Sequence, residues 1–369
     1  MSEIFYVSNI PVPDFTQSNF HPGVEGLLTL MGDNGFKFYR SPTTTQLAGP
    51  QGLIASDDLV MLKINAQWKH RGTTNADVVR GIIQRILDHP DGFSGEVFLF
   101  ENGRGRASFD CDLCDDYYAT DEVAANAEDP SHTWSWLVKE CFQDPRVSGI
   151  LFDEYRHIEV PEDDHETQGY RAFNPHPGRH PWALTSPVFN TSGGKRVDFR
   201  RGVWTGTGYD DSKFKVLNVP ILKTHRAAGV TGALKNYFGV ISIDWFNREY
   251  HAHMGLTCAE MFAHVRAPDL NILDSIWVPV NQIVGTPETH PQRANKMTAS
   301  IDPLALDYWA AKHILFPLST NPLHNPDEPL LFRYQMLLPA LHEFSSCGGC
   351  KGHPVTMDER DMQVHSLSL

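Results

Sequence analysis

The chain has 369 residues, of which 41% are hydrophobic and 21% charged, so it can bury a large core as one α/β domain or two lobes. Its formal net charge of −14 argues against a nucleic-acid partner, because affinity for the phosphate backbone depends on lysine and arginine; a local basic pocket for a small anion stays compatible with this charge. Neither a secretion signal nor an apolar run approaching about 18 residues is present, so we expect a cytoplasmic protein without a membrane partner.

The first predicted elements follow the order strand, helix, strand. Residues 59–62 form a compact apolar run, and Asn75 can cap a helix whose apolar side chains recur on one stripe. The stripe consists of Val78, Val79, Ile82, Ile83, Ile86 and Leu87. A second apolar run at 97–100 completes the unit, and a strand–helix–strand order favours parallel pairing of the two strands.

Further strands and helices are predicted after residue 130. The predicted strands are 149–152, 216–222 and 270–284, and the predicted helices are 134–141, 230–237 and 257–265. Asp302 and Pro303 begin one more helix, because aspartate caps a helix well and proline suits its first position.

This order predicts an α/β core over residues 57–320, with a largely parallel or mixed sheet flanked by helices. Residues 156–212 are polar and rich in Pro, Gly and His, and we interpret them as a long inserted loop region. Residues 1–56 are expected to wrap the core as loops and short strands. Residues 321–369 form a C-terminal segment that contains the sequence CGGC.

The chemistry is expected in the segment that begins at residue 219 and reads VPILKTHRAAGVTGALKNYFGVIS. An apolar strand would deliver Lys223, Thr224 and His225 to its C-terminal end, where ligands bind in open α/β sheets. The start of the following helix offers free N–H groups that favour an anion. The residues expected to bind there are Gly229, Thr231, Gly232, Lys235 and Asn236. The alternative is structural: a solvated lysine, a hydrogen-bonded turn histidine and glycines needed for packing.

A second group of polar residues follows the first predicted strand. It consists of Lys63, Asn65, Thr73 and Thr74. Because the loops after parallel strands gather at one edge of a sheet, we expect this group to approach the same crevice as Lys223 and His225.

His225, Lys235 and His253 are predicted to share one pocket. A cationic lysine beside two imidazoles would lower the pKa of the histidines and keep them neutral, fit to accept a proton or bind a metal. His251 and His253 could also lie on one side of a strand and bind a transition metal (Zn, Fe or Ni) with His225 and Asp274. The alternative is that His251 and His253 are surface residues.

Four cysteines form two CxxC pairs, Cys111 with Cys114 and Cys347 with Cys350. They could converge as a four-cysteine site for zinc or an iron–sulfur cluster, or each pair could be a separate disulfide or pair of free thiols.

The segment KTHRAAGVTGALKNYFG resembles the signature of domain-of-unknown-function family 362, an uncharacterised family of bacteria and archaea. The blocks VMLKINAQ, GTTNADVVRGII, FNREYHAHMGLTCAEMFAHVRAPDLNILDSI and ASIDPLALDYWAAK extend the resemblance over about residues 57–316. The resemblance implies a fold and a site without a settled reaction. Some relatives are labelled iron–sulfur proteins because they carry a ferredoxin-type module, whose repeated cysteine run is missing here.

The spacing of His225, Lys235 and His253 is also similar to that in nickel-dependent lactate racemase, where lysine and histidine hold a nickel-pincer cofactor and move protons. These observations favour a metal-assisted enzyme that acts on a small anionic metabolite by proton transfer or redox chemistry. The alternatives are an iron–sulfur electron-transfer protein and an anion-binding protein without catalysis. A second copy of the chain, in a homodimer, is the other partner considered.

Overall fold

A computed structural model describes residues 1–112, 123–176, 183–242, 247–283, 285 and 289–369. Its centre is an eight-stranded mixed sheet. In spatial order the strands are β17 (Met362–Ser368), β1 (Ser2–Ser8), β16 (Gln292–Ser300), β15 (Leu270–Val278), β12 (Phe214–Asn218), β4 (Leu59–Lys63), β5 (Glu96–Glu101) and β6 (Val147–Leu151). The five strands from β15 to β6 are parallel, which confirms the predicted α/β class.

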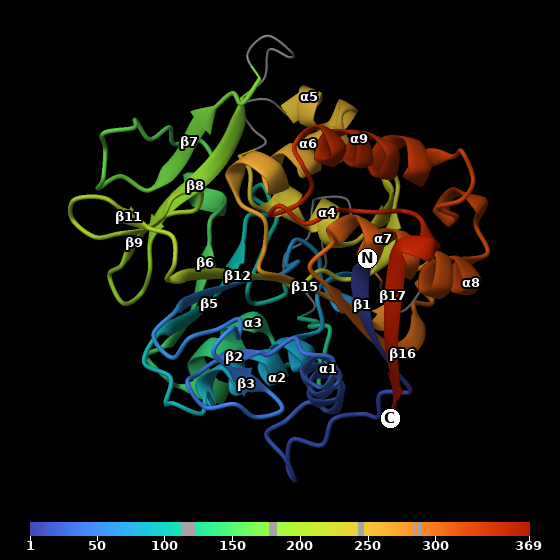
Figure 1. Ribbon diagram of the computed structural model, residues 1–369, viewed down its shortest axis with the longest axis horizontal. Coiled ribbons are helices and arrows are strands. Elements are labelled where there is room, and N and C mark those ends of the chain that lie inside the picture. Colours follow the sequence, from blue (N-terminus) through green and yellow to red (C-terminus); the bar gives the residue numbers. More distant parts are fainter. Residues whose placement is uncertain (113–122, 177–182, 243–246, 284, 286–288) are drawn as a thin grey trace.

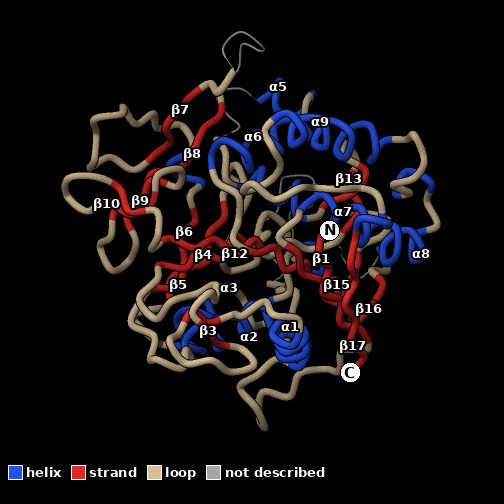
Figure 2. The backbone as a smooth tube through the Cα atoms, viewed as in Figure 1, coloured by secondary structure: helices blue, strands red, loops and turns tan. Residues whose placement is uncertain are grey.

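Both faces of this sheet are covered, as its continuous apolar strands require. In β4, Leu59 and Met61 pack into one apolar cluster, whereas Val60 and Leu62 pack into a second cluster on the opposite face. Figure 2 shows the strands crossing the molecule between two groups of helices.

One face carries α1 (Pro22–Asp33), α2 (Ala76–Leu87) and α3 (Trp134–Trp136), with the short strands β2 (Tyr39–Arg40) and β3 (Ala48–Gly49) (Figure 1). The other face carries α4 (Ala233–Asn236), α5 (Asn247–Ala252), α6 (Met254–Glu260), α7 (Pro303–Ala310), α8 (Phe316–Ser319) and α9 (Leu338–Ser346). Single turns complete the helical elements: η1 (His70–Gly72), η2 (Leu137–Phe142), η3 (Asp153–Tyr155), η4 (Tyr237–Gly239), η5 (Met261–Val265), η7 (Ala311–Leu315), η8 (Pro322–His324), η9 (Arg333–Leu337) and η10 (Glu359–Asp361).

Hydrogen bonds confirm two of the predicted helix starts, those of α2 and α7. The Asn75 side chain accepts from the backbone N–H groups of the first turn of α2, and the Asp302 carboxylate does the same at the start of α7, with Pro303 in the first position. Each cap satisfies N–H groups that have no partner within the helix.

The segment 156–212, which we expected to be a loop region, contains a second sheet. Its five antiparallel strands lie beside the main sheet (Figure 1), in the order β11 (Tyr209–Asp210), β10 (Gly202–Trp204), β9 (Arg196–Asp198), β8 (Leu184–Asn190) and β7 (Gly169–Phe173). Most of these strands are short, and polar residues interrupt them, so the apolar periodicity that would indicate strands is weak in the sequence.

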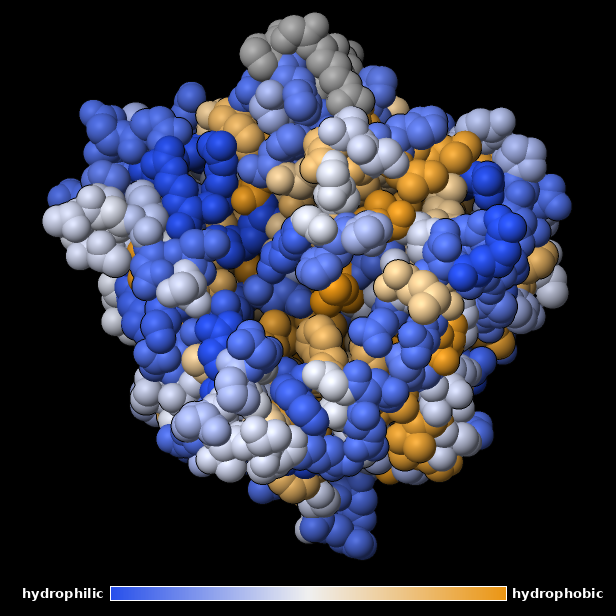
Figure 3. Space-filling model, in the orientation of Figure 1, coloured by the Kyte–Doolittle hydropathy of each residue, from blue (hydrophilic) through white to orange (hydrophobic). Residues whose placement is uncertain are grey.

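The N-terminal segment also differs from the wrapping role expected of it. β1 lies inside the main sheet, antiparallel to β16 and parallel to β17, and pairs with β17 from Ser2–Met362 to Ser8–Ser368. The first and last strands of the chain are therefore neighbours. In the described part of the chain, no helix has the length and apolar character needed to cross a bilayer. The face shown in Figure 3 is mostly hydrophilic, with smaller hydrophobic groups.

Candidate functional site

A cavity of about 230 Å³ lies where the loops after β4, β5 and β12 meet. The basic residues that line it are Lys223, Lys235, Arg104, Arg106, His225 and His251, and Glu101 is its acidic residue. The hairpin of β13 (Lys223–His225) and β14 (Gly229–Thr231) leads into α4, which carries Lys235. This edge is the one at which open α/β sheets bind ligands.

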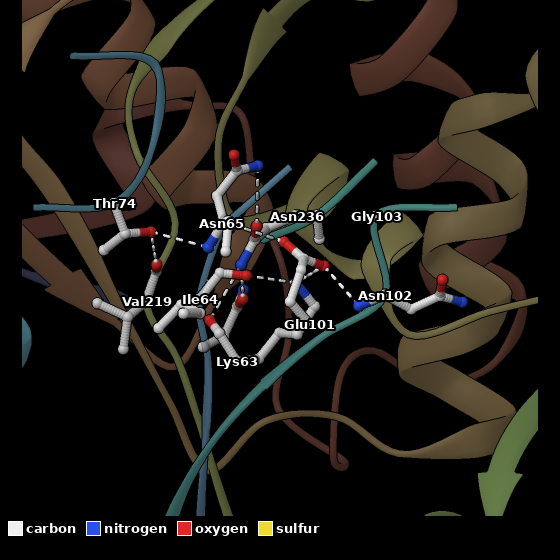
Figure 4. Close-up of polar contacts among 12 residues, drawn as sticks. Lys63, Ile64, Asn65, Thr74, Glu101, Asn102, Gly103, Val219 and Asn236 are labelled. Carbon is white, nitrogen blue, oxygen red and sulfur yellow. Dashed lines mark hydrogen bonds and ion pairs between the residues drawn. The ribbon is translucent and has the colours of Figure 1, made fainter. Parts of the chain in front are cut away.

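The floor of the cavity contains a buried ion pair between Lys63 and Glu101, with Nζ and Oε1 2.9 Å apart (Figure 4). Glu101 also accepts from the backbone N–H groups of Ala66 and Asn102, and Lys63 donates to the carbonyl of Ile64. Burial lowers the pKa of Lys63 and raises that of Glu101. Glu101 is paired with Lys63. Its single negative charge therefore cannot balance most of the positive charge of the other basic residues that line the cavity.

The two predicted groups of residues do come together. Lys223 Nζ lies 3.3 Å from Asn65 Oδ1 and donates to the carbonyl of Gly72 at 2.5 Å. The Asn65 amide in turn faces Asn236 Oδ1 at 3.5 Å (Figure 4). Asn236 itself donates to Asn218 and to the carbonyl of Lys63, which ties the start of α4 to the ends of β4 and β12.

Three threonines expected at this site have other contacts. Thr74 donates to the carbonyl of Val219 and accepts from the N–H of Asn65, so it joins two loops beneath the cavity. Thr73 is buried and contacts the carbonyl of His70. The Thr224 hydroxyl bonds to His324 Nε2 at 2.8 Å and lines a neighbouring cavity, which shares His225.

Lys223 is buried in this cavity, and Lys235 is partly buried. Desolvation lowers the pKa of Lys223 to about 7 and that of Lys235 to about 8; the Glu101 carboxylate opposes both shifts, and the neighbouring positive charges add to them. Among the described residues neither lysine has a carboxylate within ion-pair distance. Lys235 Nζ lies 3.9 Å from the centre of the Phe238 ring instead.

One polar group in the wall has no partner among the described residues. The Thr231 hydroxyl is buried and lines the cavity, yet it makes no hydrogen bond there. A buried hydroxyl of this kind costs free energy unless it is hydrogen-bonded. The cavity therefore combines positive charge with an unsatisfied donor, which is the chemistry that an oxyanion complements.

The turn that follows His225 fixes the orientation of its imidazole ring. Its Nδ1 atom accepts from the N–H groups of Ala227 at 3.2 Å and Ala228 at 3.0 Å. Burial lowers the pKa of His225 well below its usual value, and the charges of Lys235 and Lys223 lower it further, so the ring is neutral. A neutral imidazole that accepts at Nδ1 carries its proton on Nε2. The other edge of the ring is therefore a hydrogen-bond donor and not a metal ligand.

The expected pocket of His225, Lys235 and His253 is not formed. His251 lines the cavity, whereas His253 lies exposed at the start of α6. The reason is local: His251 belongs to helix α5 and not to a strand, and residues two apart in a helix point in very different directions. The predicted alternation of these two histidines on one side of a strand is wrong.

The hydrogen-bond acceptor at the start of α4 is a side chain of the protein, in place of the expected anion. The Asp307 carboxylate accepts from the N–H groups of Ala233 at 2.6 Å and Leu234 at 3.0 Å. A Cβ atom on Gly232 would collide with this carboxylate, and one on Gly229, which has φ of +78°, would collide with Phe332. Both glycines thus serve packing and turn geometry. Asp307 lies in the block ASIDPLALDYWAAK, but no local pattern predicted its contact with α4, because it is 74 residues beyond Ala233.

The other expected metal ligands do not converge either. Asp274 is buried, where it accepts from the N–H groups of Asn75 and Ile276, and burial raises its pKa to about 7. Cys111 packs in the apolar cluster on one face of the sheet and Cys350 in the cluster on the other face, so these two cysteines are separated by the sheet. Cys114 lies outside the described residues, and Cys347 lies in a cluster with His176, His264 and Glu343.

Sequence reasoning missed the loop Gly103–Arg106, which follows β5 and brings Arg104 and Arg106 to the cavity. The Asp153 carboxylate shapes this loop by accepting from the N–H groups of Gly103 and Gly105. Arg104 has a positive φ of 63°, a conformation that is uncommon for residues other than glycine and is often found at functional sites. The sequence feature that could have indicated this loop is Gly103-Arg104-Gly105-Arg106, a basic Gly-x-Gly sequence that follows the buried strand β5.

Residues 212–312 match the sequence model of a family described as Domain of unknown function (DUF362). The chain is therefore similar to DUF362 proteins over residues 212–312. The matched region contains β12, the β13–β14 hairpin, Lys235 and Asp307, so it supplies both lysines of the cavity and the cap that holds α4. The loops after β4 and β5, which complete the cavity, lie before it. Comparison with curated proteins and with solved structures found no match.

Proposed function

We propose that the chain is an enzyme that binds a small anionic metabolite in this cavity and transfers a proton to or from it. One observation carries the proposal: Lys223 and Lys235 line the same small cavity, Lys223 buried and Lys235 partly buried, and neither has a carboxylate within ion-pair distance among the described residues. Buried lysines with pKa values near neutrality are suited to acid–base catalysis, since they exchange protons at the pH of the cell.

The surroundings of the two lysines suggest different roles. Lys223 is fixed by Asn65 and the carbonyl of Gly72, which suits a charge that holds a carboxylate or phosphate. Lys235 contacts the Phe238 ring instead of an oxygen, so its amine is available to accept or donate a proton. The Nε2–H of His225 and the Thr231 hydroxyl are the hydrogen-bond donors proposed to complete the anion site.

The size of the cavity limits the substrate. Its volume of about 230 Å³ is below the roughly 300–1,000 Å³ of sites for drug-sized ligands. We therefore propose a metabolite with few carbon atoms and one or two anionic groups. Metal assistance in this cavity is not part of the proposal, because the available edge of His225 is protonated and Glu101 is engaged by Lys63.

A binding screen followed by isotope exchange tests this proposal. Small carboxylates and phosphate esters would be screened by calorimetry, and those that bind would be incubated with the protein in D₂O and followed by NMR. We expect deuterium to enter a C–H position next to the anionic group, and Lys235→Met to abolish this exchange. The control is Lys213→Met, which removes an exposed lysine paired with Asp57. Binding without any exchange would instead indicate a non-catalytic anion-binding protein, and no binding at all would refute the proposal.

A further inference from the structure

A second cluster of reactive side chains lies apart from the residues that line the cavity. It consists of His176, His264, Glu343 and Cys347. One ligand atom from each of the four lies within 4.8 Å of the others. Among the described residues, this is the one group of three or more His, Cys, Asp or Glu side chains that is placed to hold a single metal ion.

Three separate parts of the chain supply these side chains. Glu343 and Cys347 lie four residues apart at the end of α9, so they are on the same face of that helix. His264 belongs to η5, which continues α6, and α6 packs beside α9 (Figure 1). His176 follows β7, where its own N–H donates to the Asn174 side chain.

Five of the six distances between the ligand atoms approach those of a coordination shell, and the sixth, between His176 and Cys347, is within 4.8 Å. The Nε2 atoms of His176 and His264 are 3.1 Å apart, and they lie 3.5 and 3.6 Å from Glu343 Oε1. Cys347 Sγ lies 3.4 Å from His264 Nε2 and 3.2 Å from Glu343 Oε1. Ligands at the usual zinc distances of about 2.0–2.3 Å would be about 3.3–3.7 Å apart around a tetrahedron.

Hydrogen bonds alone explain this arrangement poorly. All four atoms can act as metal ligands, and all four face one another, whereas one proton between two of them joins only that pair. Glu343 is also completely buried, and a cation beside it would offset the cost of burying its charge. A cation at the centre would satisfy all four groups together.

We propose that His176, His264, Glu343 and Cys347 bind one Zn²⁺ ion. The charges support this metal, because a thiolate and a carboxylate balance its two positive charges while the two imidazoles stay neutral. A sulfur ligand argues against Mg²⁺ and Ca²⁺, which prefer oxygen. On binding, the Cys347 Sγ–H bond breaks and its proton passes to solvent as the zinc–sulfur bond forms.

Four protein ligands make this a closed site, which is the pattern of structural zinc. The ion would fasten the end of β7 and the helices α6 and α9 to one point, although these segments lie far apart in the sequence. It would act as a cross-link and not as the catalyst of the reaction proposed above, so the two proposals can fail independently.

The test uses the full chain, stripped with a chelator and titrated with Zn²⁺ in competition with a chromophoric chelator. We expect one zinc per chain. Cys347→Ser and His176→Ala should each reduce the affinity for zinc more than about 100-fold, because changing even a residue that only hydrogen-bonds to a ligand costs about 10–100-fold. Replacement by Co²⁺ should give intense visible bands and a thiolate-to-cobalt charge-transfer band, and Cys347→Ser should lose the latter.

Two cysteine controls separate this site from the alternatives. Cys350→Ser tests whether the CGGC pair binds the metal, and Cys141→Ser tests for a general thiol effect; both should keep zinc at full affinity. His176 is more exposed than His264 and Glu343, with 31% of its side chain accessible, so His176→Ala is expected to keep the fold, which circular dichroism would check. No stoichiometric zinc, or full affinity in both ligand variants, would overturn the proposal. So would loss of zinc in a folded Cys350→Ser variant.

Discussion

Lys223 Nζ lies 3.3 Å from Oδ1 of Asn65, a residue 158 positions earlier in the chain. This contact joins the loop after β4 to the β13–β14 hairpin and fixes one of the two lysines that line the cavity. Because the asparagine is neutral, it orients the ammonium group without cancelling its charge. The positive charge of Lys223 is therefore left for a ligand.

Asn65→Asp should weaken anion binding strongly while it barely changes the volume of the side chain. A carboxylate at this distance would pair with Lys223, raise the pKa of the lysine and repel an incoming anion. We expect affinity for the anions found in the screen to fall at least about tenfold, the effect of 1.4 kcal/mol. Calorimetry measures this, with Asn34→Asp on the exposed end of α1 as the control. Unchanged affinity would show that Lys223 does not hold the anion.

The affinity for anions should fall as the pH rises. The pKa of Lys223 is lowered to about 7 and that of Lys235 to about 8, so both are charged at pH 6 and largely neutral at pH 9. Each lysine that must be protonated costs about tenfold in affinity for each pH unit above its pKa. We expect at least a 100-fold loss between pH 6 and pH 9 in calorimetric titrations. A flat profile would mean that the lysines do not titrate in this range.

His251→Ala and His253→Ala should have opposite outcomes. His251 lines the cavity and His253 is exposed, although the two are only two residues apart. We expect His251→Ala to lower exchange activity or anion affinity several-fold and His253→Ala to leave both unchanged. The two variants control for each other in one assay. An equal loss in both variants would support the pocket of His225, Lys235 and His253 that the sequence predicted.

Asp307→Ala should destabilise the protein, because it leaves the N–H groups of Ala233 and Leu234 buried without a partner. We expect a loss of about 2–6 kcal/mol in the free energy of unfolding at pH 5, at about 1–3 kcal/mol for each of the two lost bonds, measured by urea denaturation. Asp163→Ala, an exposed position, is the control.

The loss caused by Asp307→Ala should be smaller at pH 8 than at pH 5. Burial raises the pKa of Asp307 from 3.8 to about 7, so the folded state keeps a proton that the unfolded state releases between these values. The stability that Asp307 contributes is therefore present at low pH and is lost as the pH rises toward 7. A loss that grows with pH would show that the carboxylate is charged when folded.

Local patterns in the sequence predicted much of the main sheet. Apolar runs at 59–62 and 97–100 became β4 and β5, and the caps Asn75 and Asp302 began α2 and α7 as expected. The convergence of Asn65 with Lys223 also followed from a simple rule, that loops after parallel strands meet at one edge. These features depend on neighbours in sequence or on a topology that the order of elements implies.

The features that were not predicted correctly depend on contacts between residues that are far apart in the sequence. The cap of α4 comes from Asp307, and Cys347 contacts His264 and Glu343. No local spacing reveals such contacts. The sequence His251-Ala-His253 fits a strand or a helix equally well, and only packing decides between the two.

The pairing of β1 with β17 has a consequence for how the protein folds during synthesis. β1 is made first, but one of its two neighbours in the sheet is made only when translation reaches residues 362–368. Until then one edge of β1 has no strand beside it, and unpaired strand edges attract other chains. Contacts of such long sequence separation also form slowly. The nascent chain therefore depends on a late closing step, and removal of residues 362–368 should favour aggregation over a stable shortened protein.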